Sequence, residues 1–198
     1  MSERIRAFLA VSPDAPVKSA LANIVSQVRG VGAAGVALAR PDSIHLTLKF
    51  LGDISKPQVD SVERAVTVAV SGIPELNLTL GRAGVFPSSR SPRVLWVGLE
   101  GDLDGLADLQ RSVEEATADL GFARERRRFS PHLTIGRVRN GARPEEARRA
   151  IEALIAAEVP AAVRLDVRSV DLVRSILLPS GAIYETLAKF PLAGQADA

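Results

Sequence analysis

The chain has 198 residues, of which 46% are hydrophobic and 24% are charged, so it is long enough for one domain with a sizeable core. It contains no cysteine, which excludes disulfides, cysteine nucleophiles and thiolate metal sites. The formal net charge is +2, yet residues 124–149 hold nine arginines against three glutamates. Because the placement of charge decides what a region attracts, this basic zone favours an anionic substrate.

Nothing near the start of the chain is typical of a targeting segment. The apolar run "AFLAV" is too short for a secretion signal, and Pro13 and Asp14 end it. Elsewhere no stretch approaches the ~18 apolar residues that a membrane span needs. We therefore expect a soluble, cytoplasmic protein that does not contact a membrane.

Strand and helix patterns alternate along the chain. The first strand is expected over residues 4–11, with Ile5, Phe8 and Leu9 buried, and a helix then runs from Asp14 to Arg29. The other expected strands are 43–51, 75–87, 93–100, 131–138, 161–177 and 183–192, and the other expected helices are 55–70, 102–121 and 143–157. No linker or composition break divides the chain, so we expect one α/β or α+β domain over residues 1–198.

The only two histidines lie in matching contexts. His45 belongs to "SIHLTLKFLG" and His132 to "SPHLTIGR", each in the tripeptide His-Leu-Thr with a serine two residues earlier. A Pro-initiated helix pattern follows each motif, which makes a weak internal repeat. Side chains alternate along a strand, so His45 shares a face with Thr47, and His132 shares one with Thr134. Two such copies allow a site with pseudo-two-fold symmetry.

Two imidazoles and two hydroxyls suit in-line displacement at phosphorus. The attacking and leaving oxygens lie on opposite sides of the phosphorus atom, and both need proton transfer. Imidazole, with an ordinary pKa near ~6.5, can act as acid or as base around neutral pH. The threonine hydroxyls can donate to the non-bridging oxygens, where negative charge grows. This chemistry requires no metal.

The motifs "HLTLKFLG" and "FSPHLTIGR" resemble the paired His-x-Thr motifs of the two-histidine phosphoesterase superfamily. The nearest likeness is to the RNA 2′,3′-cyclic phosphodiesterases, also called 2′-5′ RNA ligases. It extends to "RIRAFLAV", "PRVLWVGL" and "SILLPSGAIYETL", and so covers nearly the whole chain. The resemblance implies a bilobal α+β fold, with two antiparallel sheets flanked by helices around a central groove.

The resemblance also implies an activity. Members of the family open a terminal 2′,3′-cyclic phosphate and leave a 2′-phosphate. Since the two-imidazole chemistry requires no metal, we expect no cofactor. The implied partner is RNA with that end, tRNA fragments included, and a monomer without an obligatory protein partner would suffice.

Site residues follow from the same resemblance. It places His45 and His132 in the acid and base roles. We expect His45 to be the acid for the departing 3′ oxygen and His132 to be the base for water, and the near-symmetry of the motifs leaves the reverse assignment open. It places Thr47 and Thr134 on the phosphoryl oxygens.

Two further residues, each five positions after a histidine, match family positions. Arg137 matches an arginine that contacts phosphate, although an ordinary surface position is the alternative. Phe50 matches an aromatic side chain that lines the groove, and a core position is its alternative. The chain departs from the commoner pattern at Ile135 and Gly136, just before Arg137. Trp96 is expected in the core, with a stacking platform as the alternative, and Ser175 and Tyr184 are taken as structural.

Alternatives to RNA end processing stay open at this point. The substrate of the same chemistry could be a nucleoside 2′,3′-cyclic phosphate or an ADP-ribose cyclic phosphate. A non-catalytic RNA-binding module is the third reading. The run "RERRR" at 124–128 is either a solvated face or a contact for an RNA backbone.

Overall fold

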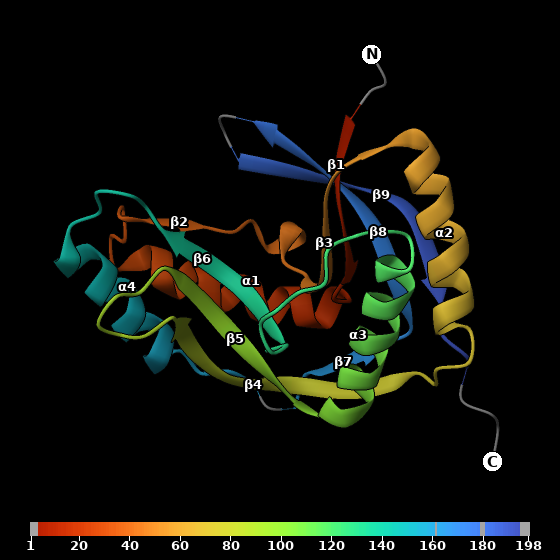
Figure 1. Cartoon of the computed structure of the whole chain (residues 1–198). Helices are drawn as coiled ribbons and strands as arrows, with labels where there is room; N and C mark the ends of the chain where they lie inside the picture. Colours follow the sequence, from red (N-terminus) through yellow and green to blue (C-terminus); the bar gives the residue numbers. More distant parts are fainter. Residues whose placement is uncertain (1–3, 161, 179–180, 195–198) are drawn as a thin grey trace.

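The structure is a computed structural model that describes residues 4–160, 162–178 and 181–194. Its frame is one antiparallel sheet in two halves (Figure 1). One half contains β7 (Arg164–Val167), β4 (Leu76–Phe86), β5 (Val94–Gly101) and β6 (His132–Val138), with the short β2 (Val36–Leu38) on β6. The other half contains β3 (Leu46–Ser55), β1 (Arg4–Val11), β8 (Ser169–Leu178) and β9 (Gly181–Pro191).

The two halves meet at a single residue pair, Leu46 of β3 with Leu133 of β6. The predicted α+β class is therefore confirmed, and the two sheets implied by the resemblance are the two halves on either side of this seam. Both leucines are fully buried, so the seam is part of a core that continues under both halves.

The helices flank the two halves of this frame. α1 (Ala15–Gly30) and α4 (Pro144–Ala156) lie against the half that contains β4, and α2 (Lys56–Val70) and α3 (Leu103–Ala118) lie against the half that contains β3, with the 3-10 turn η1 (Pro41–Ser43) just before β3. The starts of the helices follow from local chemistry. Asp14 accepts from the backbone N–H of Val17, and Asp102 accepts from that of Gly105. These side chains satisfy N–H groups that the first helical turn leaves free.

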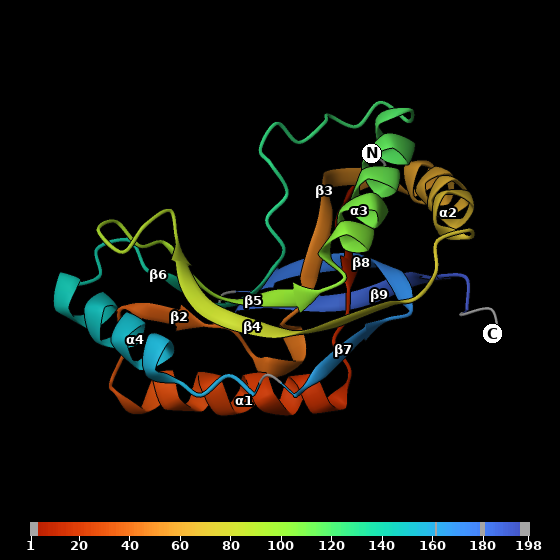
Figure 2. The ribbon, with the colours of Figure 1, turned by 90° about the horizontal axis from the view of Figure 1, so that it is seen from below.

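Two helices pack across the seam. α1 follows β1 in the chain but packs against α4 and β7 of the opposite half. α3 follows β5 but packs against β3 and α2, which belong to the other half. Figure 2 shows α1 under β2 and β4, and α3 beside α2.

Most expected elements are confirmed, with differences at four places. The strand expected over 43–51 begins only at Leu46, just after His45, and continues to Ser55. The helix expected to end at Gly121 ends at Ala118. The long strand expected over 161–177 is two strands, β7 and β8, separated at Arg168; its first residue lies outside the described part of the chain. The segments β2 and η1 were not expected.

Within the residues that the structure describes, no helix is long and apolar enough to cross a membrane.

Candidate active site

The seam brings the two His-Leu-Thr motifs together. In an antiparallel register set by Leu46 and Leu133, the neighbouring positions place His45 beside Thr134 and Thr47 beside His132. Since both leucines point into the core, the alternation of side chains sends all four polar groups to the opposite face. The pseudo-two-fold relation inferred from the sequence is thus centred on this one pair.

A β-bulge follows each motif and re-aims the chain. In β6 the register with β5 steps from Trp96–Thr134 to Leu95–Gly136, which leaves Ile135 as an extra residue. An extra residue inverts the alternation of side chains, so Arg137 shares the face of Thr134 although the two are three positions apart.

A β-bulge also follows the first motif. The register of β3 with β1 steps from Ala10–Thr47 to Leu9–Lys49, which leaves Leu48 extra. Phe50, five residues after His45, is thereby on the same face as Thr47. The bulges therefore explain why the residue five places after each histidine can reach the site.

The unusual Ile135-Gly136 pair has a structural reason. A Cβ atom on Gly136 would lie 3.0 Å from a methyl group of Val36 and 3.1 Å from the carbonyl oxygen of Ala37. Strand β2 thus runs so close to the bulge that only glycine fits without a local shift. Neither β2 nor this close approach could be predicted from the motif alone.

Each imidazole is fixed by a carbonyl group two residues earlier. Nδ1 of His45 lies 2.9 Å from the backbone oxygen of Ser43, and Nδ1 of His132 lies 2.7 Å from that of Ser130. A carbonyl oxygen can only accept, so Nδ1 carries the proton in both rings and Nε2 is left for substrate. The serines noticed in the sequence thus act through their backbone.

The surroundings lower the pKa of both imidazoles. Burial is the main cause of the lowered pKa of His45; the hydrogen bond to Ser43 opposes it, and the positive charges of Arg137 and His132 add to it. Burial likewise lowers the pKa of His132, against its hydrogen bond to Ser130, and Arg137 lowers it further. Arg137 therefore acts electrostatically on both rings.

These shifts make a prediction about pH. As pH rises, each imidazole should lose its charge below the ordinary value of about 6.5, so both rings of the free protein are neutral at pH 7. Nitrogen-detected NMR titration of the two rings measures this directly. Arg137→Gln should raise both pKa values, because a positive charge is removed. Titration of either ring above about 6.5 in the intact protein would contradict the prediction.

The aromatic surroundings of the two rings differ. His45 stacks on Phe8, with ring centroids 4.5 Å apart, and meets Tyr184 edge-on at 5.1 Å. His132 meets Phe86 edge-on at 5.1 Å, and Phe86 stacks on Trp96. The site is thus symmetric in its polar groups and asymmetric in its apolar walls.

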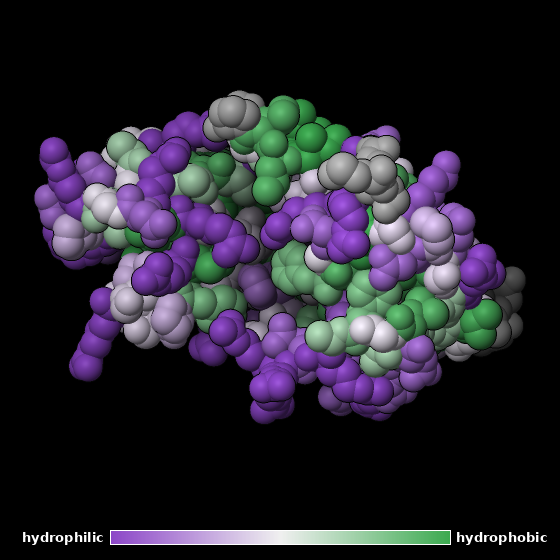
Figure 3. Space-filling model, turned by 45° about the horizontal axis from the view of Figure 1, so that its top comes forward, coloured by the Kyte–Doolittle hydropathy of each residue, from purple (hydrophilic) through white to green (hydrophobic). Residues whose placement is uncertain are grey.

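A groove of about 450 Å³ lies over this face, a volume in the range of small-molecule sites. Five of the six predicted site residues line it: His45, Thr47, Phe50, Thr134 and Arg137. His132 does not line the groove, although its positive charge, when it is protonated, lowers the pKa of His45. Figure 3 shows a hollow in the middle of the molecule, bordered by both hydrophilic and hydrophobic residues.

The threonine hydroxyls and Phe50 are available to a ligand. Among the described residues, neither Thr47 nor Thr134 has a side-chain hydrogen bond, so both hydroxyls can donate to a bound group. Phe50 is 65% exposed, which rules out the core position that was its alternative.

Sequence reasoning missed several residues of the groove. Ser175 and Tyr184, taken as structural, belong to its wall. Trp96 was assigned to the core, but it is half-buried and pairs with Thr134 across the strands. Phe8 is buried as expected, yet it packs on the groove side with Ala10 and not with the main core. The alternation of Phe8 with the core residue Leu9 was the available clue.

The basic loop at 124–128 does not line the groove, whereas Arg6 and Arg40 do. These two arginines come from parts of the sequence without a charge cluster. Of the basic zone over residues 124–149, only Arg137 lines the groove, and whether the run at 124–128 contacts an RNA backbone stays a prediction.

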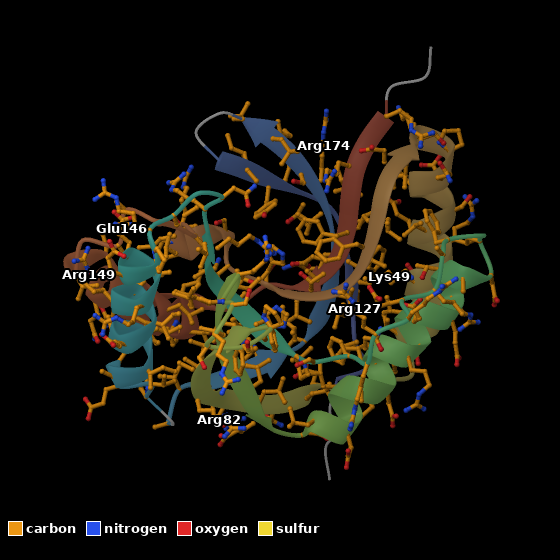
Figure 4. All side chains as sticks on the ribbon, turned by 60° about the vertical axis from the view of Figure 1, so that its left-hand side comes forward. Lys49, Arg82, Arg127, Glu146, Arg149 and Arg174 are labelled. Carbon is orange, nitrogen blue, oxygen red and sulfur yellow. The ribbon has the colours of Figure 1, made fainter. Side chains whose placement is uncertain are left out.

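A buried ion pair ties the first motif to the loop before the second. Lys49 Nζ lies 2.5 Å from Glu114 Oε1 of α3, and it also donates to the carbonyl oxygen of Ala123 at 2.6 Å. The same Glu114 oxygen accepts from the backbone N–H of Glu125. Figure 4 shows Lys49 close to the loop that carries Arg127. That loop leads to Ser130, whose carbonyl orients His132.

No group of three or more histidine, cysteine or acidic side chains that could hold a metal ion occurs in the described part of the chain.

Comparisons with known proteins identify the family of the chain. The family model described as "LigT like Phosphoesterase" matches the chain twice, over residues 11–96 and over residues 97–184. The chain belongs to this family. Each match contains one of the two His-Leu-Thr motifs, which supports the internal repeat.

Curated relatives of this LigT-like phosphoesterase cover almost all of it. The RNA 2′,3′-cyclic phosphodiesterase of Methanothermobacter thermautotrophicus is 34% identical over 96% of the chain and 100% of its own length. The protein of the same name from Thermotoga maritima is 32% identical over 92% of the chain and 93% of its own length.

Solved structures share the fold. The protein TT0787 of Thermus thermophilus matches with a TM-score of 0.77 and 26% identity, over 96% of this chain and 100% of that one. E. coli LigT in complex with 3′-AMP matches with a TM-score of 0.73 and 23% identity, over 96% of this chain and 99% of that one.

The position of Arg137 predicts a sensitivity to conservative change. Lysine keeps the charge but lacks the planar, two-pronged contact to phosphate, so Arg137→Lys should lower kcat/KM by about tenfold or more. Steady-state kinetics with a cyclic phosphate substrate measures the effect. Arg139→Lys is the matched control, because Arg139 donates to the backbone of Ala34 and lies outside the groove. Equal behaviour of the two variants would remove Arg137 from the site.

Proposed function

We propose that this LigT-like phosphoesterase hydrolyses the 2′,3′-cyclic phosphate at the end of an RNA to a 2′-phosphate. The observation that carries the proposal is the seam, where two imidazoles with free Nε2 atoms and two unengaged threonine hydroxyls share one face. The names of the curated relatives support the substrate class. The proposed partner is RNA with such an end, tRNA fragments included, bound by a monomer.

The proposed reaction needs one neutral and one protonated imidazole. His132 takes a proton from water through Nε2 as the water oxygen bonds to phosphorus. His45 gives its Nε2 proton to the 3′ oxygen as the bond between phosphorus and that oxygen breaks. The hydroxyls of Thr47 and Thr134 and the guanidinium of Arg137 donate to the non-bridging oxygens. A 5′-hydroxyl group in place of water would give a 2′-5′ linkage by the same steps.

Hydrolysis of matched substrates tests the proposal. Purified protein should convert an RNA oligomer with a 2′,3′-cyclic phosphate end to the 2′-phosphate, which differs from the 3′-phosphate in chromatography and in phosphorus NMR. The same assay on a nucleoside 2′,3′-cyclic phosphate and on an ADP-ribose cyclic phosphate tests the small-molecule alternative. Binding of RNA without turnover of any cyclic phosphate would favour the non-catalytic reading and overturn the proposal.

The proposed mechanism also predicts the effect of metal removal. In this mechanism the two imidazoles transfer the protons. The two hydroxyls and the guanidinium stabilise the negative charge on the phosphoryl oxygens. No step uses a metal ion, so excess chelator should leave the rate unchanged. Rates measured before and after treatment with chelator and removal of bound ions check this. If activity disappeared and returned only with a divalent ion, the two-imidazole scheme would be wrong.

A further inference from the structure

Three arginines from three separate elements line the groove, and the proposed reaction uses only one of them. Arg137 belongs to β6, Arg6 to β1, and Arg40 precedes η1. Both Arg6 and Arg40 are exposed, and within the described residues neither guanidinium has a hydrogen bond or an ion pair. No aspartate or glutamate in the described part of the chain lines the groove. The groove therefore carries more positive charge than one phosphate requires.

Arg6 is placed by the strand that also supports His45. It is two residues before Phe8, so both side chains project from the same face of β1, about 7 Å apart along the strand. Phe8 stacks directly on the ring of His45. Arg6 thus lies one step further from the reacting phosphate than the imidazole does.

Asp53 is the nearest acidic residue to Arg6 in the register, opposite it in β3. It forms no ion pair with Arg6. Arg6 is therefore free to bind an anion from the groove, with Asp53 weakening the attraction.

Arg40 is held by the turn that orients His45. Its carbonyl oxygen accepts from the backbone N–H of Ser43 at 2.8 Å and from the Ser43 hydroxyl at 2.7 Å. The carbonyl of Ser43 in turn accepts from His45. This chain of hydrogen bonds fixes the start of the Arg40 side chain relative to the catalytic ring.

We propose that Arg6 and Arg40 form a second phosphate subsite, which binds the phosphate on the 5′ side of the nucleotide that carries the cyclic phosphate. The inference rests on the proposed function and narrows its substrate class. Arginine suits this task because its planar guanidinium makes two parallel contacts to phosphate oxygens. A substrate with a 5′ phosphate or phosphodiester occupies both sites, whereas a nucleoside 2′,3′-cyclic phosphate occupies only the first.

The test compares three substrates that differ only on the 5′ side: a nucleoside 2′,3′-cyclic phosphate, its 5′-phosphorylated form, and a dinucleotide with the same cyclic end. Arg6→Gln and Arg40→Gln should each raise KM for the last two by about tenfold and leave the first nearly unchanged. They should also lessen the salt dependence of kcat/KM for the dinucleotide, by about 0.7 in the log–log slope for each charge lost. If KM rose for the dinucleotide alone, the subsite would bind a phosphodiester and not a terminal phosphate.

Controls keep the outcome clear. Arg149→Gln removes an exposed arginine of α4, outside the groove and marked in Figure 4, and should change nothing. Asp53→Asn should lower KM for the dinucleotide, because it removes the opposing charge. Thermal unfolding shows that the variants fold, and Arg6→Lys and Arg40→Lys should restore part of the loss.

Three results would overturn the subsite. The first is an equal rise in KM for all three substrates, and the second is no rise for any of them. The third is a selective rise in KM that appears only when Arg124, Arg126, Arg127 and Arg128 are neutralised. Failure of the proposed function gives a different result, since the unaltered protein would then hydrolyse none of the three. Calorimetric binding of a dinucleotide ending in a 2′-phosphate still measures the subsite in that case, with the same variants and the same expected ratios.

Discussion

Replacing either His45 or His132 with alanine should lower turnover of a cyclic phosphate roughly 10²- to 10⁴-fold, because in the proposed reaction each ring carries one of the two protons that move. The double variant should lose far less than the product of the single losses, since acid and base act together. Single-turnover kinetics isolates the chemical step, and thermal unfolding checks that the folds are intact. Near-normal turnover in either single variant would return that histidine to a structural role.

The pH profiles of these variants also test which ring is acid and which is base. The intact enzyme should show a bell-shaped profile, with its maximum on the acidic side because both pKa values are lowered. If His45 is the acid, His45→Ala should abolish the fall in residual activity at high pH. If His132 is the base, His132→Ala should abolish the fall at low pH. The reverse pattern would exchange the roles.

Removing one partner of the buried pair Lys49 and Glu114 should destabilise the fold by about 3–5 kcal/mol, because the other charge is left buried. The Lys49 side chain is only 3% exposed and that of Glu114 12%, so water compensates little for the lost partner. Chemical denaturation of Lys49→Met and Glu114→Gln measures the loss. Lys56→Met, at an exposed lysine, is the matched control and should change stability little.

The double variant Lys49→Met/Glu114→Leu separates stability from positioning. It removes both charges, so most of the free energy of unfolding should return. The loop contacts of the pair with Ala123 and Glu125 stay lost. Hydrogen exchange at the Glu125 N–H should therefore be faster, and the rate of catalysis should remain low although the protein is stable. If both the stability and the rate of catalysis recovered fully, the pair would not position the loop before His132.

Local chemistry predicted the elements well where patterns were long. Amphipathic helices with caps at Asp14 and Asp102 were found at the expected places because their starts depend on neighbouring residues. The three-residue β2 has no periodicity of its own, and it forms because β6 offers an edge. The break at Arg168 likewise depends on which strands each part joins, β4 for β7 and β1 for β8.

The site divides in the same way. The polar groups were predictable because both histidines lie in one repeated motif. The bulges at Leu48 and Ile135 were not, since only the partner strands show where a residue is extra. Simple alternation would have turned Arg137 away from the site, so its position there needs the bulge. The place of Tyr184 in the groove depends on the pairing of β9 with β8, which lies far along the chain from either motif, so neither motif could predict it.

The exchange of helices across the seam has a consequence for motion. Two half-sheets that share one residue pair could open and close like a clamshell, with the imidazoles on opposite rims. Here α1 braces one side of the seam and α3 the other, each anchored in the half to which its own strand does not belong. Opening would have to pull both helices from their packing at once. We therefore expect this packing to resist opening of the seam and to hold the two imidazoles at a nearly constant spacing before a substrate binds.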